Sequence, residues 1–473
     1  MIKSTKGATL RCCQDKHRAH LVSSALISSD SSLVWTGIFT AQEAQNPENT
    51  ALAIYNISDI NLGGIPAEFT CHPPCTKNEQ TISEHAVVFK HNSMTAVAAE
   101  KKESWIVLYI GTANGQLIKL VLDEASRFHC SKLLYKSGRD NTVFPRMYFK
   151  PDHKYIYIAF KNQIRQVSVT QCGTYSTLKD CIVSNDPFCG WCVKLNRCST
   201  ENYCKDSPWL SVPKDSLMKE LSSFLVTMTH EKVILNLHLN LKATEHPPLT
   251  CYFKIGNKEL CDGNGSTAVF PKCSCSFSRQ HVSPDGHAVR VKLTIGAQTL
   301  TENLTLRNCP KINNTSPFAR CAACASAGCQ WFPSNQTCSW SAVSSPHIDM
   351  QEICEEKYFE RDYMPEIFFI HVKEVSLNGI SNAVIKGKNL ELVERIRFQG
   401  LMDCRLNEVP VLARSNDTLS FHIPSGNKET VRVCVVTGDK RCHSNAAITY
   451  VDAEFGCFCL RKENSRSKCL TST

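Results

Sequence analysis

Cysteines are the residues of this chain whose spacing could do chemistry. The segment 172–204 holds six of them in 33 residues, and Cys189-x-x-Cys192 has the spacing of half a zinc site or of a thioredoxin-like redox pair. No second Cys or His couple of zinc spacing lies nearby, and no strand-CxxC-helix pattern surrounds the pair. Structural disulfides are therefore favoured, zinc remains the alternative, and the folding compartment is oxidising.

A second segment repeats the pattern. Between Cys309 and Cys354 lie Cys321-x-x-Cys324, Cys329-Gln330-Trp331 and Cys338. We call residues 172–204 the first knot and residues 309–354 the second knot. Each knot is too short to build an ordinary hydrophobic core, so cross-links must hold it together.

The first knot resembles a known module. The run Asp186-Pro-Phe-Cys-Gly-Trp-Cys192, preceded by Cys172-x-x-Tyr175 and Cys181, is similar to the PSI module of plexins, semaphorins and integrins. In that family eight cysteines pair first to fourth, second to eighth, third to sixth and fifth to seventh. The first knot lacks the second position, where Leu178 stands, and the eighth.

The second knot lacks the fifth position, where Phe332 stands, and the seventh. In each knot the two missing positions are partners in the family scheme, which supports the alignment. The resemblance then implies the disulfides Cys172–Cys189, Cys181–Cys198, Cys192–Cys204, Cys309–Cys329, Cys324–Cys338 and Cys321–Cys354.

The segment before the first knot is expected to consist of β-strands. Trp105–Ile110 and Gln116–Leu122 are β-rich runs joined by an Asn114-Gly115 turn, which predicts a hairpin. Two further strand pairs are expected, 33–39 with 51–55 and 155–160 with 164–169. Three pairs at about 55–60-residue spacing indicate propeller blades, and before a PSI module they resemble the last blades of a sema domain.

The segments after the knots alternate with period two. Glu231–Leu241 places leucines toward a core and His238 toward water, and Val289–Ile295 repeats the pattern, which predicts a β-sandwich. A short helix is expected over Pro213–Phe224. The segment Pro365–Val451, with its Gly-Lys-Asn-Leu390 loop, resembles an IPT immunoglobulin-like domain.

The expected fold is all-β, with PSI and IPT modules alternating behind a partial sema propeller. Its predicted domains are 1–171 (C-terminal sema blades), 172–206 (first PSI module), 207–307 (first IPT-like sandwich), 308–356 (second PSI module), 364–451 (second IPT sandwich) and 452–473 (unassigned tail). Two PSI modules favour a plexin over semaphorins or the hepatocyte growth factor receptor family. The Gln116–Val121 strand and Cys273-Ser-Cys275 most resemble a class C plexin.

Charge and motifs narrow the function classes. The formal net charge of +9 is scattered among acidic residues, which does not indicate nucleic-acid binding. No catalytic motif or carboxylate pair is found, so no enzymatic activity, cofactor or metal is expected. Seven glycosylation sequons agree with secretion: Asn56, Asn264, Asn303, Asn313, Asn314, Asn335 and Asn416.

The chain shows no secretion signal, although its disulfides require an oxidising compartment. The first 20 residues lack the apolar core of a signal peptide, no apolar run reaches the roughly 18–20 residues that span a bilayer, and the 27 cysteines are an odd number. We therefore expect a fragment, a splice form or a mis-started gene of a longer receptor, with the last favoured.

The resemblance implies a function. It points to the ectodomain of a semaphorin receptor at the extracellular face of the plasma membrane, with a class 7 semaphorin as partner and receptor homo-association as a second contact. In the family the recognition surface lies mainly on blades outside this chain, so no residue is assigned as a ligand contact. A secreted adhesive or structural protein, or an ectodomain like that of the hepatocyte growth factor receptor, is the alternative.

Overall fold

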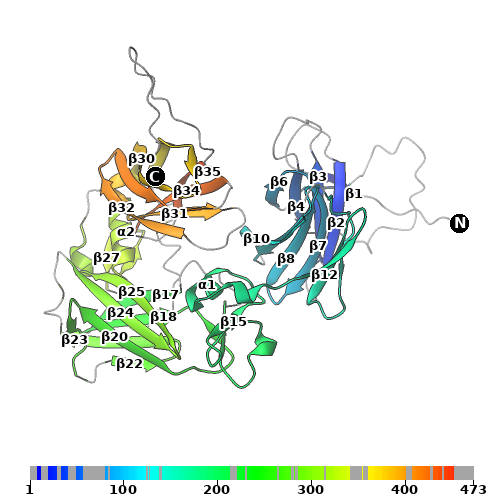
Figure 1. Ribbon diagram of the computed structural model, residues 1–473. Coiled ribbons are helices and arrows are strands. Elements are labelled where there is room, and N and C mark those ends of the chain that lie inside the picture. The colour runs from blue at the N-terminus through cyan, green and yellow to red at the C-terminus, as the bar shows by residue number, and fades with distance from the viewer. Residues whose placement is uncertain are drawn as a thin grey trace, which may run out of the picture.

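Strands dominate the computed structural model (Figure 1). It describes residues 8–11, 20–28, 33–40, 50–56, 80–83, 86–123, 126, 128–137, 141–213, 221–229, 232–263, 266–278, 282, 286–313, 316–340, 354, 361–400, 407–426, 430–438 and 442–451. In this part of the chain the α-helices are α1 (Leu178–Val183) and α2 (Pro317–Ser326), and short 3₁₀ turns accompany them. The expected all-β, disulfide-rich fold class is confirmed.

The N-terminal third forms three antiparallel sheets whose strands pair in chain order. The first contains β2 (His20–Ser28), β3 (Leu33–Thr40), β4 (Thr50–Asn56) and β6 (Ala86–His91). The second contains β7 (Met94–Lys102), β8 (Trp105–Thr112), β9 (Gln116–Leu122) and β10 (Phe128–Lys136), and the third β11 (Tyr148–Phe149), β12 (Tyr155–Ala159) and β13 (Ile164–Ser168). A parallel pair, β1 (Ala8–Arg11) with β5 (Gln80–Ser83), accompanies them.

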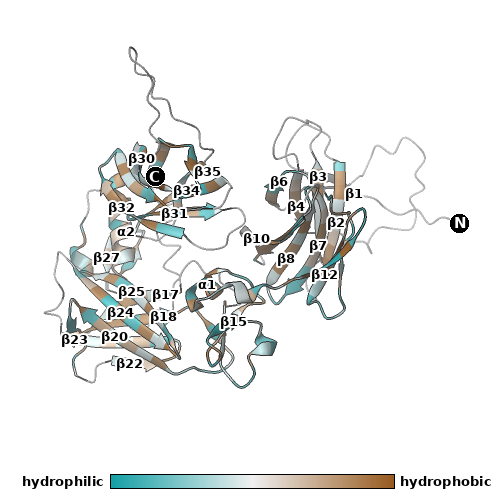
Figure 2. Ribbon diagram, viewed as in Figure 1, coloured by the Kyte–Doolittle hydropathy of each residue, from teal (hydrophilic) through white to brown (hydrophobic). Residues whose placement is uncertain are grey.

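The second sheet lies between the other two, because its side chains are buried on both faces. Ile106 and Leu108 pack in one cluster with Leu52 of the first sheet, and Val107 packs in another cluster with Ile156 of the third. Every residue of β8 is buried, and Figure 2 shows β8 in the colour of hydrophobic residues. The structure forms all three expected strand pairs, β3–β4, β8–β9 and β12–β13.

The first knot contains a helix followed by a hairpin. Its elements are η1 (Cys172–Thr174), α1, β14 (Gly190–Cys192), β15 (Arg197–Ser199) and η2 (Glu201–Tyr203). The side chain of Thr177 accepts a hydrogen bond from the amide of Asp180 and so caps α1. Strand β14 also pairs with β16 (Trp209–Ser211), which in turn pairs with β19 (Lys242–Ala243). The sheet of the knot therefore continues beyond residue 206, where we placed the end of the module.

A sandwich of two four-stranded sheets follows. One sheet contains β17 (Ser222–Met228), β18 (Lys232–Leu239), β23 (Lys272–Ser278) and β22 (Ser266–Val269). The other contains β21 (Lys258–Glu259), β20 (Leu249–Ile255), β24 (His287–Ile295) and β25 (Gln298–Leu306). Leucines of β18 are buried as expected, whereas His238 is half-buried rather than exposed. The short helix expected over 213–224 is wrong at its end, because residues 222–224 belong to β17, and residues 214–220 lie outside the described residues.

The second knot repeats the helix and the hairpin. Its elements are η4 (Cys309–Lys311), α2, β26 (Gln330–Phe332) and β27 (Thr337–Ser339). Ser316 caps α2 by accepting a hydrogen bond from the amide of Ala319, and Pro317 occupies the first turn, where no amide donor is needed.

The last module is an eight-stranded assembly. Its strands, in spatial order, are β28 (Glu366–Ile370), β30 (Ile380–Lys388), β33 (Thr418–Ile423), β32 (Asn407–Arg414), β31 (Arg395–Gly400), β34 (Thr430–Val436), β35 (Cys442–Val451) and β29 (Glu374–Ser376). The turns η7 (Arg361–Tyr363) and η8 (Leu390–Leu392) complete it. Phe398, Phe421 and Tyr450 pack in its core.

Candidate functional site: two disulfide knots and the sheet that the first one contacts

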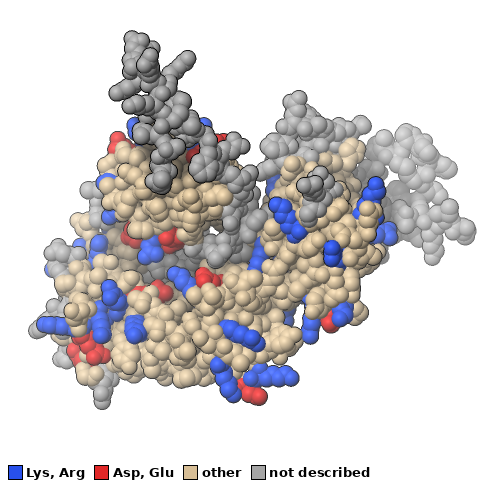
Figure 3. Space-filling view, in the orientation of Figure 1, with Lys and Arg blue, Asp and Glu red and all other residues tan. Residues whose placement is uncertain are grey.

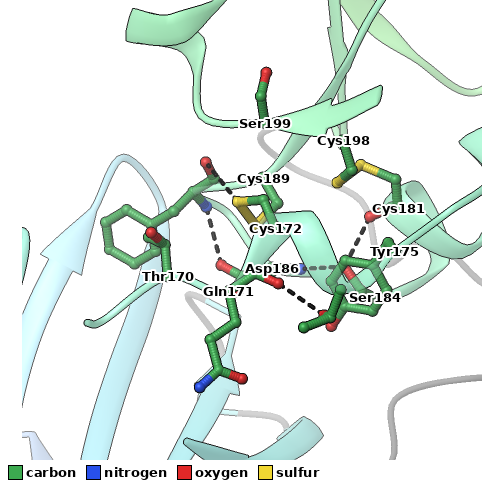
Figure 4. Close-up of a disulfide and its surroundings, with 12 residues drawn as sticks. Thr170, Gln171, Cys172, Tyr175, Cys181, Ser184, Asp186, Cys189, Cys198 and Ser199 are labelled. Carbon is green, nitrogen blue, oxygen red and sulfur yellow. Dashed lines mark hydrogen bonds between the residues drawn. A yellow bond between two sulfur atoms is a disulfide. The ribbon is translucent and has the colours of Figure 1, made fainter. Parts of the chain in front are cut away.

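All six cysteines of the first knot are buried and paired, and Figure 4 shows two of the disulfides, Cys172–Cys189 and Cys181–Cys198. The Cα–Cα distances are 5.4 Å for Cys172–Cys189, 5.7 Å for Cys181–Cys198 and 5.5 Å for Cys192–Cys204, within the range that a disulfide can bridge. Cys189 and Cys192 therefore belong to different disulfides, and neither sulfur is a free thiolate that could bind zinc. Among the described residues, no three His, Cys, Asp or Glu side chains are grouped closely enough to hold a metal ion.

The second knot is paired in the same way. The Cα–Cα distances are 5.7 Å for Cys309–Cys329, 6.0 Å for Cys321–Cys354 and 5.8 Å for Cys324–Cys338. In both knots the structure brings together the cysteines that the family scheme pairs. The connectivity remains a prediction for chemical mapping of the disulfides.

Three more disulfides were not paired from the sequence. Cys251 of β20 bonds to Cys273 of β23 and so joins the two sheets of the first sandwich. Cys261 bonds to Cys275, two residues further along the same inward face of β23. Cys434 and Cys442 join β34 to β35.

A buried ion pair connects the second sheet to the first knot. The ammonium of Lys119, on β9, donates to both carboxylate oxygens of Asp186 at 2.8 and 2.9 Å. It also donates to the carbonyl of Val169 at 3.1 Å and lies 4.5 Å from the centre of the Phe188 ring. The two charged side chains are only 1% and 6% exposed. Water is therefore excluded from the pair, and its attraction is not weakened by the solvent.

Asp186 also shapes its own turn. Its Oδ1 accepts a hydrogen bond from the amide of Phe188 at 3.1 Å, and its carbonyl accepts one from the amide of Cys189 at 2.9 Å. Figure 4 shows the Asp186 carboxylate beside the Cys172–Cys189 disulfide and Ser184. One carboxylate thus holds the turn before Cys189 and fixes that turn against the sheet.

A second lysine contacts the start of the knot. The ammonium of Lys132, on β10, donates to Thr174 Oγ1 at 2.9 Å and to the Tyr175 hydroxyl at 3.1 Å, and lies 4.3 Å from the Tyr175 ring centre. Gln171 Nε2 donates to the carbonyl of Leu134 at 2.8 Å. Trp105 of β8 belongs to the same apolar cluster as residues of the knot. Polar and apolar contacts together orient the knot on the sheet.

Sequence reasoning did not find the role of Lys119. The available signal was a lysine within the otherwise apolar run Leu117–Leu122, all of which is buried in the structure. A charged residue at such a position is almost never fully buried without a partner. The partner could not be named, because 67 residues separate the two.

Burial also perturbs a tyrosine near this ion pair. The Tyr109 hydroxyl donates to Glu100 Oε1 at 2.6 Å. Burial raises the pKa of Tyr109 well above its ordinary value, and the negative charges of Glu100 and Asp186 raise it further. Tyr109 is therefore held in its neutral, hydrogen-donating form.

Contacts continue from module to module. Gln298, the first residue of β25, donates to Asn196 Oδ1 in the first knot at 2.8 Å. The amide of Val226 on β17 donates to the carbonyl of Gly328 in the second knot at 2.9 Å. Phe318 of that knot makes an edge contact with His443 of β35, with ring centres 5.2 Å apart. Each module is thus fixed to the next by side-chain or backbone contacts.

The structure describes the side chains of four of the seven sequon asparagines. Asn303, Asn313, Asn335 and Asn416 have exposed side chains. Asn56 ends β4, and its side chain lies outside the described residues, as do Asn264 and Asn314 entirely. In the described part, none of the helices is long and apolar enough to cross a membrane.

Comparison with known proteins matches one module and, more distantly, most of the chain. A family model described as PSI, the plexin repeat, matches residues 171–216. Plexin-C1 of Homo sapiens is 25% identical and covers 92% of this chain, and plexin-C1 of Mus musculus is 24% identical over 94% of it. Plexin A3 of Danio rerio is 27% identical over 52% of the chain.

The chain spans less than a third of these relatives, 29% of human and 30% of mouse plexin-C1. Among solved structures, the Plexin A4 full extracellular region covers 93% of the chain at 18% identity, with 51% of its own length matched and a TM-score of 0.36. Drosophila Plexin A in complex with Semaphorin 1b covers 41% at 13% identity, with 50% of its own length matched and a TM-score of 0.30. The predicted resemblance to plexins, and among them to a class C plexin, is confirmed by the sequence relatives.

Proposed function

We propose that this chain is part of the ectodomain of a plexin-type cell-surface receptor, which binds semaphorins by protein–protein contact in cell guidance and adhesion signalling. The observation that carries the proposal is the similarity to plexin-C1 over 92% of the chain. The PSI match over residues 171–216 and the disulfide-rich, all-β structure support an extracellular location.

The proposed partner is a semaphorin of class 7, because the relatives that cover most of the chain are class C plexins. We propose that the stacked sheets 20–169 belong to the recognition head and that residues 172–451 form its support. The contacts between successive modules favour a support that holds the head in a defined orientation.

A chimeric receptor tests the function. The segment of the plexin-C1 ectodomain that matches this chain is replaced by residues 1–451, and binding to an immobilised class 7 semaphorin is measured by surface plasmon resonance. If the proposal holds, the chimera should be secreted and should bind the semaphorin with an affinity within about tenfold of the parent receptor, a difference of about 1.4 kcal/mol. A class 3 semaphorin serves as the unmatched control.

Two results would contradict the proposal. A folded, secreted chimera that no longer binds would favour the alternative of a secreted adhesive protein built from the same modules. Binding of a growth factor rather than a semaphorin by the chimera would favour the alternative of an ectodomain like that of the hepatocyte growth factor receptor.

A further inference from the structure

Three cations lie side by side on the outer face of the sheet β21-β20-β24-β25. Side chains alternate along β20 and β24, so Tyr252 and Lys254 on one strand, and Arg290 and Lys292 on the other, all point outward and are exposed. Lys254 lies directly opposite Arg290, and Tyr252 opposite Lys292. Cross-strand neighbours have Cβ atoms about 4.5–5.5 Å apart, and the next residue on the same face follows about 7 Å along the strand. Three positive charges therefore lie within two adjacent cross-strand pairs of β20 and β24.

None of these cations forms an ion pair within the described residues, although Glu259 lies opposite Lys254 on the edge strand β21. The other outward residues of the four strands are Thr250, Ala288, Thr294, Thr299, Thr301, Asn303 and Thr305. Figure 3 shows Lys and Arg side chains, with Asp and Glu side chains beside them, on the surface over β20 and β24.

This arrangement is unfavourable for folding by itself. Like charges directly opposite each other in a sheet destabilise it, whereas opposite charges would stabilise it. Glu259 offsets part of this cost at Lys254, but Arg290 and Lys292 face only the uncharged Asn303 and Thr301 on β25. Their charges are therefore left for an anionic ligand.

We propose that this face binds a sulfated polysaccharide of the glycosaminoglycan type. The face is the outer surface of a sheet, which suits a linear polyanion lying across it, whereas a small anion is ordinarily held in a concave site with converging donors. Lysine and arginine supply the charges for the sulfate groups, and arginine can donate two parallel hydrogen bonds to one of them. Tyr252 is 49% exposed and offers an aromatic surface to a sugar ring beside Lys292.

The sequon Asn303 borders this face, because Asn303 lies opposite Arg290 on β25. A glycan there would flank the cations from one side and leave β20, on the other side of β24, open. The polysaccharide would then run along β20 and β24. This proposal concerns a second ligand and does not depend on semaphorin binding.

Heparin is the probe for the test. The secreted, glycosylated full chain is compared with the triple variant Lys254→Gln, Arg290→Gln, Lys292→Gln by surface plasmon resonance on immobilised heparin at about 0.15 M NaCl, where screening acts beyond about 8 Å. The matched control, Lys232→Gln, Lys272→Gln, Lys311→Gln, removes the same charge from exposed positions off this face. We expect the face variant to bind at least about tenfold more weakly and the control variant to bind like the wild type.

Thermal unfolding checks that the face variant is folded, and its midpoint should stay close to that of the wild type, because the substitutions remove both the repulsion between Lys254 and Arg290 and the attraction of Lys254 to Glu259. Equal weakening of both variants would show that net charge alone binds heparin, and this result would overturn the proposal. No heparin binding by the wild type, or binding only after Asn303→Gln, would also overturn it. Weakened semaphorin binding with unchanged heparin binding would assign the face to a protein partner instead.

Discussion

The ammonium of Lys119 lies 2.8 Å from the Asp186 carboxylate and connects two parts of the chain 67 residues apart. Strand β9 supplies the cation, and the Asp-Pro-Phe-Cys turn of the first knot supplies the anion. A buried pair of this kind is weak evidence for added stability, because each charge loses its hydration. We expect it to favour this arrangement, since a contact between sheet and knot that buried the two side chains apart would leave two charges without partners.

Removing one partner should therefore cost more than removing both. Asp186→Asn keeps an oxygen for the Phe188 amide but leaves Lys119 buried and unpaired, so we expect a loss of about 3–5 kcal/mol in the free energy of unfolding. The double variant Lys119→Met, Asp186→Asn should recover much of that loss. Denaturant unfolding of Asp186→Asn, Lys119→Met and the double variant measures the coupling energy between the two side chains.

The exposed pair Lys150–Asp152 provides the control, with 3.6 Å between its charged atoms and both side chains about two-fifths exposed. Asp152→Asn should leave the unfolding midpoint within experimental error, because solvent screens such a pair. If Asp186→Asn were as neutral as this control, the ion pair would have no orienting role.

The sequence predicts contacts between residues that are close in the chain better than contacts between distant ones. The knots could be outlined from spacing and family resemblance, because helix, hairpin and cysteines lie close together in the chain. The alternation in 231–241 located the core side of β18 for the same reason. The contact of Lys119 with Asp186 depends on how two modules meet, and no local pattern carries that information.

The first sandwich shows a similar limit. Alternation along β23 places Cys273 and Cys275 on the same inward face, yet it does not say which of them meets Cys251. That choice depends on how the two sheets are aligned. The cations of β20 and β24 are likewise visible in the sequence, but only the register shows that Lys254 and Arg290 are neighbours.

Disulfide mapping tests the knots directly. Digestion without reduction, followed by mass spectrometry, should yield the six pairs Cys172–Cys189, Cys181–Cys198, Cys192–Cys204, Cys309–Cys329, Cys321–Cys354 and Cys324–Cys338. Removing one of them by paired Cys→Ala substitution should cost about 2–5 kcal/mol, because the knots have little other core. A Cys189–Cys192 bridge, or zinc retained by the native chain, would refute this connectivity.

Tyr109 should make stability depend on alkaline pH. Its pKa in the folded chain is raised above the value of about 10 of an unfolded chain, by burial first and then by Glu100. The neutral phenol therefore contributes stability that is fully present below about pH 10 and is lost as the pH rises through the folded pKa. We expect the unfolding temperature of the wild type, with free thiols blocked, to fall above pH 10 more steeply than that of Tyr109→Phe.

Tyr148→Phe is the control for this measurement, because that ring is 60% exposed. The unfolding temperature of Tyr148→Phe should fall with rising pH in parallel with that of the wild type. Parallel curves for all three proteins would show that Tyr109 does not contribute to the alkaline loss.

The exposed face of the third sheet should make the N-terminal segment aggregate when it is expressed alone. One face of β11–β13 packs on the second sheet, while the other exposes Tyr148 and Ile164, which are 60% and 71% exposed. Aromatic and aliphatic side chains gathered on an open sheet promote association. Residues 1–171, expressed in a secretory system, should aggregate or be retained, whereas residues 172–451 should be secreted folded. Size-exclusion chromatography of a monomeric 1–171 that melts cooperatively would disprove this.

The last prediction concerns semaphorin binding by the chain itself, which we expect to be poor or absent even though a full-length parent should bind well. A specific interface needs roughly 800 Å² per partner from ordered surface, and the outer face of β11–β13 leaves Tyr148 60% and Ile164 71% exposed. Ordering it on binding would consume much of the free energy of association.

The same proposal makes residues 172–451 a support, so substitutions on their surface should leave the affinity of a full-length receptor unchanged. Phe368→Ser, Leu412→Ser and Tyr252→Ser alter exposed residues of the two sandwiches and provide this test. Surface plasmon resonance on an immobilised class 7 semaphorin compares this chain, the parent and the three variants of the parent. Submicromolar binding by the chain alone, a free energy more favourable than about −8.2 kcal/mol, would place the binding site on the sheets or the support described here. In that case the three variants would show which sandwich carries it, because only substitutions within the interface would weaken the complex.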